Sequence, residues 1–262
     1  MFKHHADSIE NLINYFDGDP DVLAVILGGS VAKGCERADS DLDVMVTVTD
    51  HRYAALAKQN KLADCVFGQC TYEGGYFDIK YNTKDFLKAV AAHGSEPARN
   101  AFVNARCLTC RDAEITEIIP KIGVFQQQEK EEKILAFFSA MHLNYCYFFP
   151  IAKDDLYLKI RSAADIVLFG GRLLLQEAEV LFPCHKGLMA AVENLSCKPD
   201  SISNKANRLL SELTDEAMQE YKNAVLNFIS FKPGPPFEQY CTRFVDDNEQ
   251  WWYKERPNIT EW

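Results

Sequence analysis

The chain of 262 residues is 47% hydrophobic and 25% charged, a composition that is ordinary for a soluble globular protein and excludes a disordered one. Its formal net charge of −10 argues against a partner bound by neutralising the phosphates of a nucleic acid, and favours small or cationic partners. No segment is expected to reach the about 20 apolar residues of a membrane span. The N-terminus lacks the pattern of a signal peptide, so we predict no membrane contact and a cytoplasmic location.

The nine cysteines are scattered through apparent core segments, and without a secretion signal most of them are expected to be reduced thiols in the core. Cys107 and Cys110 have the CxxC spacing of half a zinc site or of a redox pair. No second pair or nearby histidine completes this spacing, so neither metal binding nor redox chemistry is predicted there.

The first half of the chain alternates helical and strand patterns. Residues 6–17 place apolar side chains at helical spacing, and the continuous apolar run 22–29 has the length of a central strand. The β-branched run 41–49 predicts a neighbouring strand, and 75–83 predicts a strand with one apolar and one polar face. Shorter signals predict helices near 52–60 and 83–93 and a fourth strand within 106–112.

From residue 125 onward the apolar period becomes helical, notably over 152–181, 185–195 and 201–230. We therefore predict an α+β fold. Domain 1–124 is a small mixed β-sheet with flanking helices, and domain 125–262 is an all-α helical bundle with a Trp-rich tail. The tail residues Trp251, Trp252 and Trp262 are expected to pack back onto the protein rather than to bind a ligand.

The segment LGGSVAKGCERADSDLDVMV, residues 27–46, interrupts an apolar strand and resumes with two carboxylates. Gly28 and Gly29 remove side chains where the backbone turns and can approach a ligand closely. Ser30 is predicted to be the N-cap of the short helical turn that follows, where unpaired N–H groups can hold an anion. Because the pattern is neither a Walker loop nor a GxGxxG turn, it predicts a phosphate site of another kind.

Two aspartates open the next predicted strand. Asp41 and Asp43 are two residues apart and are expected to point from the same face, where paired carboxylates can hold Mg²⁺ together with substrate phosphates. Asp78, on the polar face of 75–83, would complete a three-carboxylate cluster if its strand lies beside 41–49. Taken singly, these residues also fit a structural explanation: a tight turn, aspartates at a strand start and one aspartate on an edge strand.

In these residues the chain resembles the nucleotidyltransferase superfamily of the DNA polymerase β type, whose pattern is Gly-Ser, a spacer, Asp-x-Asp and a third acid on a later strand. The resemblance spans residues 22–83 and is nearest in motif to the antibiotic nucleotidyltransferases and the minimal nucleotidyltransferase domains. It implies a Mg²⁺-dependent transfer of a nucleoside monophosphate from ATP or another nucleoside triphosphate.

The resemblance also implies roles for the motif residues. Asp41, Asp43 and Asp78 would hold two Mg²⁺ ions, and Asp78 would help to activate the acceptor hydroxyl. Gly29 and Ser30 would line the nucleotide, with Ser30 contacting the β- and γ-phosphates.

Four further residues match the antibiotic-modifying relatives. Lys33 and Ser40 stand where several of those relatives carry nucleotide-binding residues, although a solvated helix charge explains Lys33 equally well. Relatives of the kanamycin-modifying kind place a carboxylate base and, one turn later, a phosphate-binding lysine in their helical domain. Asp155 and Lys159, which are four residues apart and so share a helix face, fit this pattern. A stabilising surface ion pair would produce the same spacing.

We therefore predict an enzyme that moves a nucleoside monophosphate, AMP from ATP in the first instance, onto a hydroxyl of a small molecule such as an aminoglycoside-like antibiotic, releasing pyrophosphate. Its partners are expected to be the nucleotide and this acceptor, with no nucleic acid and no membrane. Two alternatives are open: an enzyme that transfers AMP to a protein side chain, and a non-catalytic nucleotide sensor. The acceptor, the preferred nucleotide and the choice between monomer and homodimer are not determined by the sequence.

Overall fold

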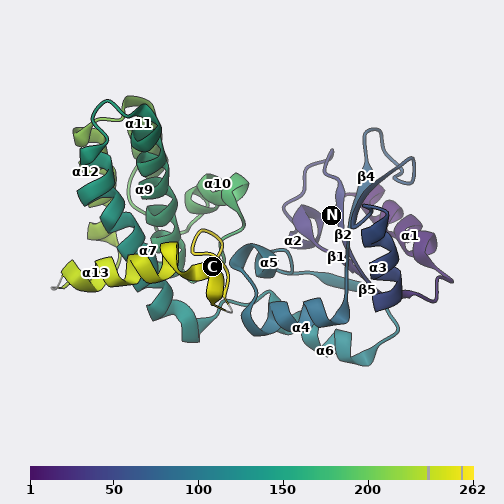
Figure 1. Ribbon diagram of the computed structural model, residues 1–262. Helices are drawn as coiled ribbons and strands as arrows, with labels where there is room; N and C mark the ends of the chain where they lie inside the picture. The colour runs from purple at the N-terminus through teal and green to yellow at the C-terminus, as the bar shows by residue number, and fades with distance from the viewer. Residues whose placement is uncertain (235–236, 255) are drawn as a thin grey trace. The chain divides into compact units, whose positions relative to one another are not determined.

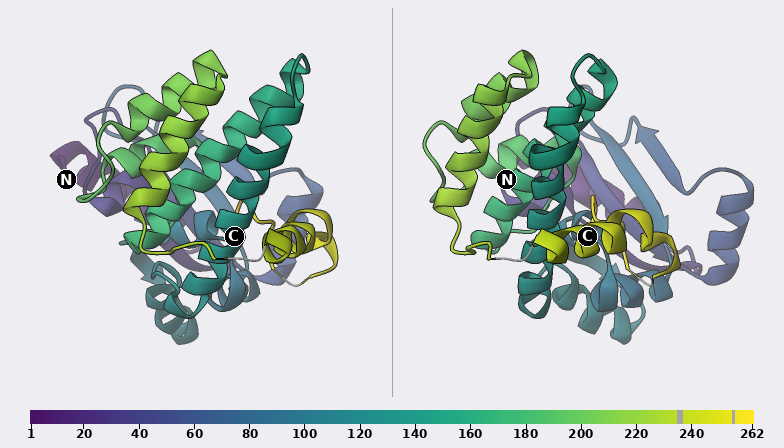
Figure 2. Two further views of the ribbon diagram at one scale, coloured as in Figure 1. Left: turned by 90° about the vertical axis from the view of Figure 1, so that its left-hand side faces the viewer. Right: turned by 60° about the vertical axis from the view of Figure 1, so that its left-hand side comes forward.

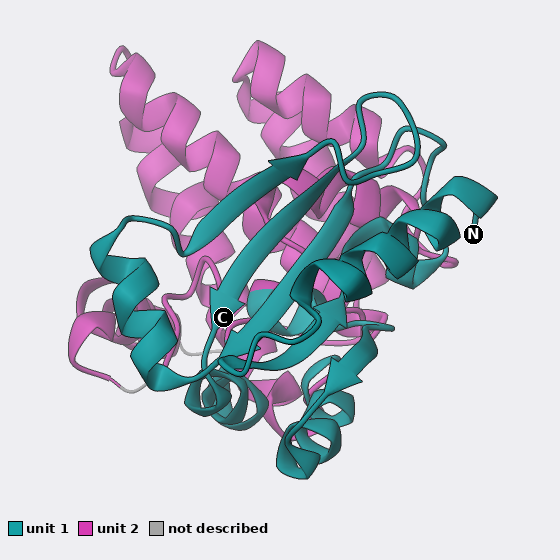
Figure 3. Cartoon of the chain, turned by 90° about the vertical axis from the view of Figure 1, so that its right-hand side faces the viewer, with its two compact units in different colours: residues 1–94, 98–124 teal, residues 95–97, 125–262 magenta. Residues whose placement is uncertain are grey.

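A computed structural model describes residues 1–234, 237–254 and 256–262 (Figure 1). The chain divides into two compact units (Figure 3), the first comprising residues 1–94 and 98–124 and the second residues 95–97 and 125–262. The main boundary between the units lies after residue 124, where the sequence predicts it. Residues 95–97 come before this boundary in the chain but belong to the second unit.

The first unit is built on a mixed five-stranded sheet in the order β3-β4-β2-β1-β5. The strands are β1 (Val22–Leu27), β2 (Leu42–Val48), β3 (Ala63–Phe67), β4 (Tyr76–Asn82) and β5 (Arg106–Cys110). β2 and β4 run parallel, and the other neighbouring pairs run antiparallel. The predicted α+β class with a mixed sheet is confirmed, and the short strand expected within 106–112 is β5. β3 was not predicted.

Helices cover both faces of this sheet. Helix α1 (Lys3–Phe16) packs Ile9 and Leu12 against the apolar side chains of one face, and it crosses the sheet in Figure 3. On the opposite face, α4 (Lys84–His93) and α6 (Ala113–Ile122) pack against β1 and against Met45 of β2. The shorter helices of the unit are α2 (Gly29–Lys33), α3 (Asp50–Lys58) and α5 (Glu96–Asn100), of which α5 crosses the unit boundary.

The second unit is helical, as predicted (Figure 2). Its helices are α7 (Lys130–Leu143), α8 (Phe149–Ile151), α9 (Leu156–Glu177), α10 (Leu188–Glu193), α11 (Ile202–Glu212), α12 (Asp215–Phe228) and α13 (Phe237–Phe244). The long helix α9 contacts α7, α10, α11 and α12, and most of its side chains after Ser162 are buried. α9 is therefore the central helix of this unit.

A buried carboxylate explains why residues 95–97 belong with the second unit. Glu96 is fully buried and accepts hydrogen bonds from Lys133 Nζ at 3.1 Å and Gln176 Nε2 at 2.6 Å. Arg172 Nη2 at 3.2 Å and the backbone N–H of Phe182 at 2.9 Å complete its shell. A buried charge is tolerated only when it is paired and hydrogen-bonded in this way, so α5 is anchored in the helical core at its first residue.

Three expectations about the side chains and the apolar segments are wrong or only partly right. All nine cysteines are free and none is buried: five are exposed, among them Cys65 on the exposed edge strand β3, and four are half-buried. Trp262 is buried under the guanidinium of Arg256, 4.6 Å from its ring, but Trp251 and Trp252 are exposed. The segment Gln127–Ile151 is long and apolar enough to cross a membrane, contrary to expectation, and half of its most apolar window is buried inside the protein.

Candidate active site

The glycine turn after β1 is shaped around Asp43. The N–H of Gly28 donates to the backbone carbonyl of Asp43 at 2.9 Å. Gly29 has φ +63°, and a Cβ placed there would lie 1.7 Å from Asp43 Oδ2. Only glycine fits this position, because any side chain would occupy the space of the carboxylate and would also strain the left-handed backbone. The turn therefore fixes the place of the Asp43 carboxylate.

Ser30 is not the helix cap that the sequence suggests. Helix α2 begins at Gly29 and its N-cap is Gly28, whose carbonyl accepts from the N–H of Ala32 at 3.3 Å. The chain enters the helix one residue earlier than predicted, since Gly29 turns in the left-handed region and Gly28 is extended. Within the described part of the chain Ser30 makes hydrogen bonds through its carbonyl, which accepts from the N–H of Cys35 at 3.1 Å, and none through its hydroxyl.

The condition for a role of Asp78 is met, because β4 lies directly beside β2. In the parallel pair, Asp43 is the register partner of Asp78, so both side chains project from the same sheet face. Asp41 lies just before β2 and outside the strand. A cavity of about 140 Å³ opens beside the pair and is lined by Gly28, Gly29, Asp43, Val44, Met45, Asp78, Lys80 and Ala101.

The carboxylates around the cavity repel one another, which is shown by the pKa of Asp43. Burial, and next the charge of Asp41, raise the pKa of the Asp43 carboxyl above its ordinary value, and Asp78 adds to this rise. Lys80 and Lys33 oppose the rise, and Lys80 Nζ also lies 3.4 Å from Asp78 Oδ2. A divalent cation held between these oxygens would relieve the repulsion and lower the pKa of Asp43.

Asp41 is engaged by a tyrosine. The hydrogen bond of the Tyr76 side chain with Asp41 is the main cause that raises the pKa of Tyr76 to about 12. Among the described residues no three His, Cys, Asp or Glu side chains converge on a single metal position. The register partners Asp43 and Asp78 nevertheless supply carboxylate oxygens, the donors that Mg²⁺ prefers. Gly29, which has no side chain, lies against Asp43.

Lys33 lies at the end of α2 and donates to Asn100 Oδ1 at 2.7 Å. Asn100 is the last residue of α5, the helix whose first residue is the buried Glu96. Lys33 also acts electrostatically on Asp43, so its ammonium group lies near the carboxylates. Sequence reasoning missed Asn100 and Tyr76. Of the residues around the aspartates, Lys80 is the one that the sequence pattern indicated, because it alternates with Asp78 on the polar face of the predicted strand 75–83.

The family model described as "Polymerase beta, Nucleotidyltransferase" matches residues 10–112, which span the glycine turn, both strands with their aspartates and Lys33. Residues 10–112 are a nucleotidyltransferase domain of the polymerase β type. The resemblance to this superfamily is thereby confirmed, and nucleotidyl transfer is the activity of this domain class. Its motif likeness to antibiotic-modifying members stays a prediction.

The other comparisons are distant. A crystal structure of a nucleotidyltransferase-like protein from Exiguobacterium sibiricum 255-15 is 9% identical, with a TM-score of 0.46 over 95% of this chain and 80% of that chain. At that TM-score the likeness supports no functional assignment. Among curated proteins, no sequence matches the chain.

Ser40 of the nucleotidyltransferase domain has a structural part in the loop before Asp41. Its Oγ accepts from the N–H of Arg37 at 2.9 Å. Its carbonyl accepts from His5 Nε2 at 3.1 Å and from the Tyr72 hydroxyl. These bonds fix the loop that leads into β2. A contact of Ser40 with the nucleotide stays a prediction.

Asp155 and Lys159 belong to the helical unit, and neither is in the nucleotidyltransferase domain. Asp155 is the N-cap of α9 and accepts from the N–H of Leu158 at 3.0 Å. Lys159 Nζ donates to the carbonyl of Phe149 at 3.0 Å and lies 3.8 Å from Asp215. In the described chain the two side chains do not form an ion pair with each other, so capping and a backbone contact account for them. Their roles as base and phosphate ligand stay predictions.

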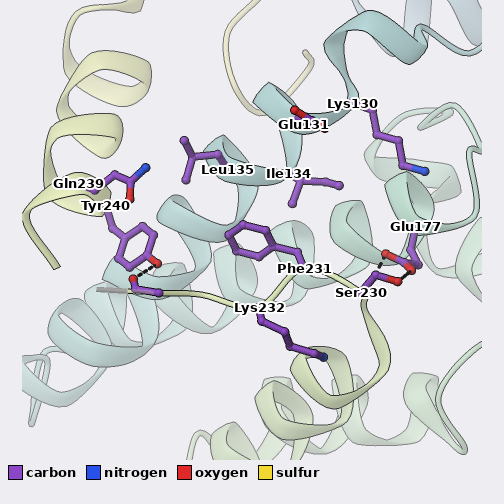
Figure 4. A pocket seen from close by; sticks show the side chains of 11 residues that line it. Lys130, Glu131, Ile134, Leu135, Glu177, Ser230, Phe231, Lys232, Gln239 and Tyr240 are labelled. Atoms are coloured by element: carbon purple, nitrogen blue, oxygen red, sulfur yellow. Dashed lines mark hydrogen bonds between the residues drawn. The ribbon is translucent and has the colours of Figure 1, made fainter. Parts of the chain in front are cut away.

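A larger cavity, of about 610 Å³, lies within the helical unit (Figure 4). Several of its polar groups already have partners: Glu177 accepts from the N–H and hydroxyl of Ser230, and the Tyr240 hydroxyl donates to the carbonyl of Gly234. Lys130 is paired with Glu179 at 2.8 Å. Size alone therefore does not make this cavity the active site, and the carboxylate cavity of the first unit is the better candidate.

Proposed function

We propose that the protein transfers a nucleoside monophosphate, AMP from ATP in the first instance, to a hydroxyl group of a small molecule. The observation that carries the proposal is the position of Asp43. Its carboxylate occupies the space that a Cβ of residue 29 would take, and its register partner is Asp78. The raised pKa of Asp43 adds to this support, because carboxylates that repel one another in a cavity form an environment that a cation would stabilise.

The register pair Asp43 and Asp78 would hold Mg²⁺, and the proposal of two ions adds Asp41 as a ligand, whose carboxylate would have to move toward the pair because no three acids converge among the described residues. Bound Mg²⁺ supplies positive charge that neutralises the triphosphate and orients its phosphates. For Asp41 to take part, its carboxylate must exchange the Tyr76 hydroxyl for the ion.

The chain's own residues account for the remaining steps. The hydroxyl of Ser30 contacts the β- and γ-phosphates and donates one hydrogen bond there, and the ammonium of Lys33 offsets the charge that develops on the departing pyrophosphate. The acceptor oxygen attacks the α-phosphorus and forms the new O–P bond, while the bond from the α-phosphorus to the pyrophosphate oxygen breaks. The acceptor proton passes to a carboxylate, for which Asp78 and Asp155 are our candidates.

The acceptor is proposed to be an amine-bearing polyol of the aminoglycoside kind. The support is general: the chain carries a net charge of −10, and an acidic surface attracts cationic ligands.

The test is incubation with Mg²⁺ and ATP labelled at the α-phosphate, over a panel of aminoglycosides, lincosamides and cell proteins. The proposal predicts label on a small molecule, and no transfer by Asp43→Asn. Label on a protein would favour the protein-modifying alternative. Binding of ATP without any transfer would favour the sensor and would overturn the proposal.

A further inference from the structure

Two aromatic rings lie against each other, tilted, near the edge of the sheet. Phe67 on β3 and Tyr76 on β4 are cross-strand partners, with ring centroids 5.2 Å apart and an interplanar angle of 32°. Phe67 is 68% exposed. A single exposed apolar side chain needs no explanation by itself, so the position of this pair is what matters.

The strand registers place the aromatic pair on the same face as the carboxylates. Tyr76 and Asp78 are two residues apart on β4 and therefore project from one face. Asp78 is paired with Asp43 on one side and with Cys65 of β3 on the other. Since Phe67 follows Cys65 by two residues, all of these side chains share a single face.

The strand order also determines the order of the glycine turn, the acids and the aromatic pair across the sheet. The glycine turn ends β1, the acids lie on β2 and β4, and the aromatic pair lies on β4 and β3. Neighbouring strands are about 4.8 Å apart, so the aromatic pair and the glycine turn lie on opposite sides of the acids. In phosphoryl transfer, the attacking and leaving oxygens are roughly in line through phosphorus. With the donor phosphates at the glycine turn, the hydroxyl arrives from the side of the aromatic pair.

We propose that Phe67 and Tyr76 form the acceptor platform of the site and take a ring of an amine-bearing, hydroxyl-bearing small molecule. The proposal rests on the proposed function, because it presumes that the donor phosphates occupy the glycine turn. Aromatic faces attract ammonium groups, and this attraction does not depend on the carboxylates that are assigned to Mg²⁺. The platform would thus select acceptors that combine a ring with a positive charge.

Calorimetric titration with kanamycin as the cationic ring probe tests this platform. Phe67→Leu keeps an apolar side chain but loses the aromatic face, whereas Phe67→Tyr keeps the face. Phe86→Leu is the matched control, since Phe86 is 45% exposed on α4 and is not part of the pair. Because Phe67 is exposed, these variants are expected to fold, which circular dichroism and thermal unfolding check.

We expect kanamycin to bind the wild type, and to bind Phe67→Leu about two- to fivefold more weakly, as for one exposed cation–π contact. Phe67→Tyr and Phe86→Leu should bind as the wild type does. Three results would overturn the platform: the wild type does not bind kanamycin, Phe67→Leu binds it as tightly as the wild type does, or the wild type prefers a tyrosine peptide to kanamycin. Titration of the same samples with ATP·Mg separates the test of the platform from the test of the proposed function. If the wild type does not bind ATP·Mg, the proposed function is contradicted, whereas the kanamycin result alone decides the platform contact.

Discussion

At the scale of single residues, the site depends on one missing side chain. A Cβ at Gly29 would lie 1.7 Å from Asp43 Oδ2, so Gly29→Ala must displace the carboxylate or the turn. We expect this variant to bind ATP·Mg at least about tenfold more weakly, within the range for a disturbed metal site. Calorimetry measures the affinity directly.

The matched control is Gly34→Ala. Gly34 also has a positive φ, +71°, but a Cβ there meets nothing within 4 Å. Both variants share the backbone strain of about 1–2 kcal/mol that a left-handed residue other than glycine carries, and only Gly29→Ala meets the carboxylate. Equal losses of ATP·Mg affinity in the two variants would show that strain alone is responsible.

A second residue-scale prediction concerns Asn100, which we regard as the positioning residue of Lys33. Removing its side-chain oxygen in Asn100→Ala frees the Lys33 ammonium from the 2.7 Å hydrogen bond, so ATP affinity should fall about two- to tenfold. A double-mutant cycle with Lys33→Met measures the coupling. If Asn100→Ala lowers ATP affinity as much in the Lys33→Met background as in the wild type, Asn100 does not act through Lys33.

At the scale of elements, patterns that reflect burial predicted the strands that carry the site. β1, β2 and β4 have continuous or alternating apolar positions because one or both of their faces are covered. β3 has mostly exposed side chains and exists through its pairing with β4, so the sequence holds no burial pattern for it. The same limit explains Ser30: a serine before an apolar turn looks like a cap, and only the backbone angles show that Gly28 has that place.

Helix boundaries in the second unit show a related limit. The predicted segment 201–230 is two helices, because Leu213 adopts φ +54° and ends α11 before Thr214 caps α12. The helical period predicted over 152–181 is longer than α9, which starts only after its cap Asp155. A helical period continues across such breaks, whereas the capping interaction depends on the folded backbone.

The contact of α1 with the loop before Asp41 gives a pH dependence. Burial is the main cause that lowers the pKa of His5 below its ordinary value of 6.5, while the hydrogen bond with Ser40 and the charge of Glu36 oppose this weakly. The lowered pKa means that the unfolded chain takes up the His5 proton more readily than the folded protein. This contribution to stability is therefore constant above pH 6.5 and is lost as the pH falls below that value.

Chemical denaturation of the wild type and of His5→Gln, compared from pH 8 to 5, measures this contribution. The free energy of unfolding of the wild type should fall more steeply below pH 6.5 than that of His5→Gln, because only the wild type has the buried imidazole. Parallel curves for the two proteins would refute the assignment to His5.

At the scale of the whole molecule, α5 belongs to both compact units, with Glu96 in the helical core and Asn100 in the nucleotidyltransferase domain. Glu96→Ala would remove the buried carboxylate that pairs with Arg172 and Lys133, and of these two only Lys133 keeps another carboxylate side chain as a partner among the described residues, Glu129 at 2.9 Å. We expect the free energy of unfolding of the helical unit to fall by about 3–5 kcal/mol. Urea denaturation measures this, with Glu131→Ala as the control because Glu131 is exposed. A loss no larger than that of the control would show that the buried network does not stabilise the unit.

The central claim is that Asp43 helps to bind a metal-associated nucleoside triphosphate, and calorimetric titration of ATP tests it most directly. Asp64→Asn is the control, because Asp64 is an exposed carboxylate on β3 whose register partner Ile79 faces away from Asp78. We predict that the wild type and Asp64→Asn bind ATP only when Mg²⁺ is present, and that Asp43→Asn binds it at least about tenfold more weakly. Mg²⁺-independent binding by the wild type, or equal affinity in Asp43→Asn, would contradict the account.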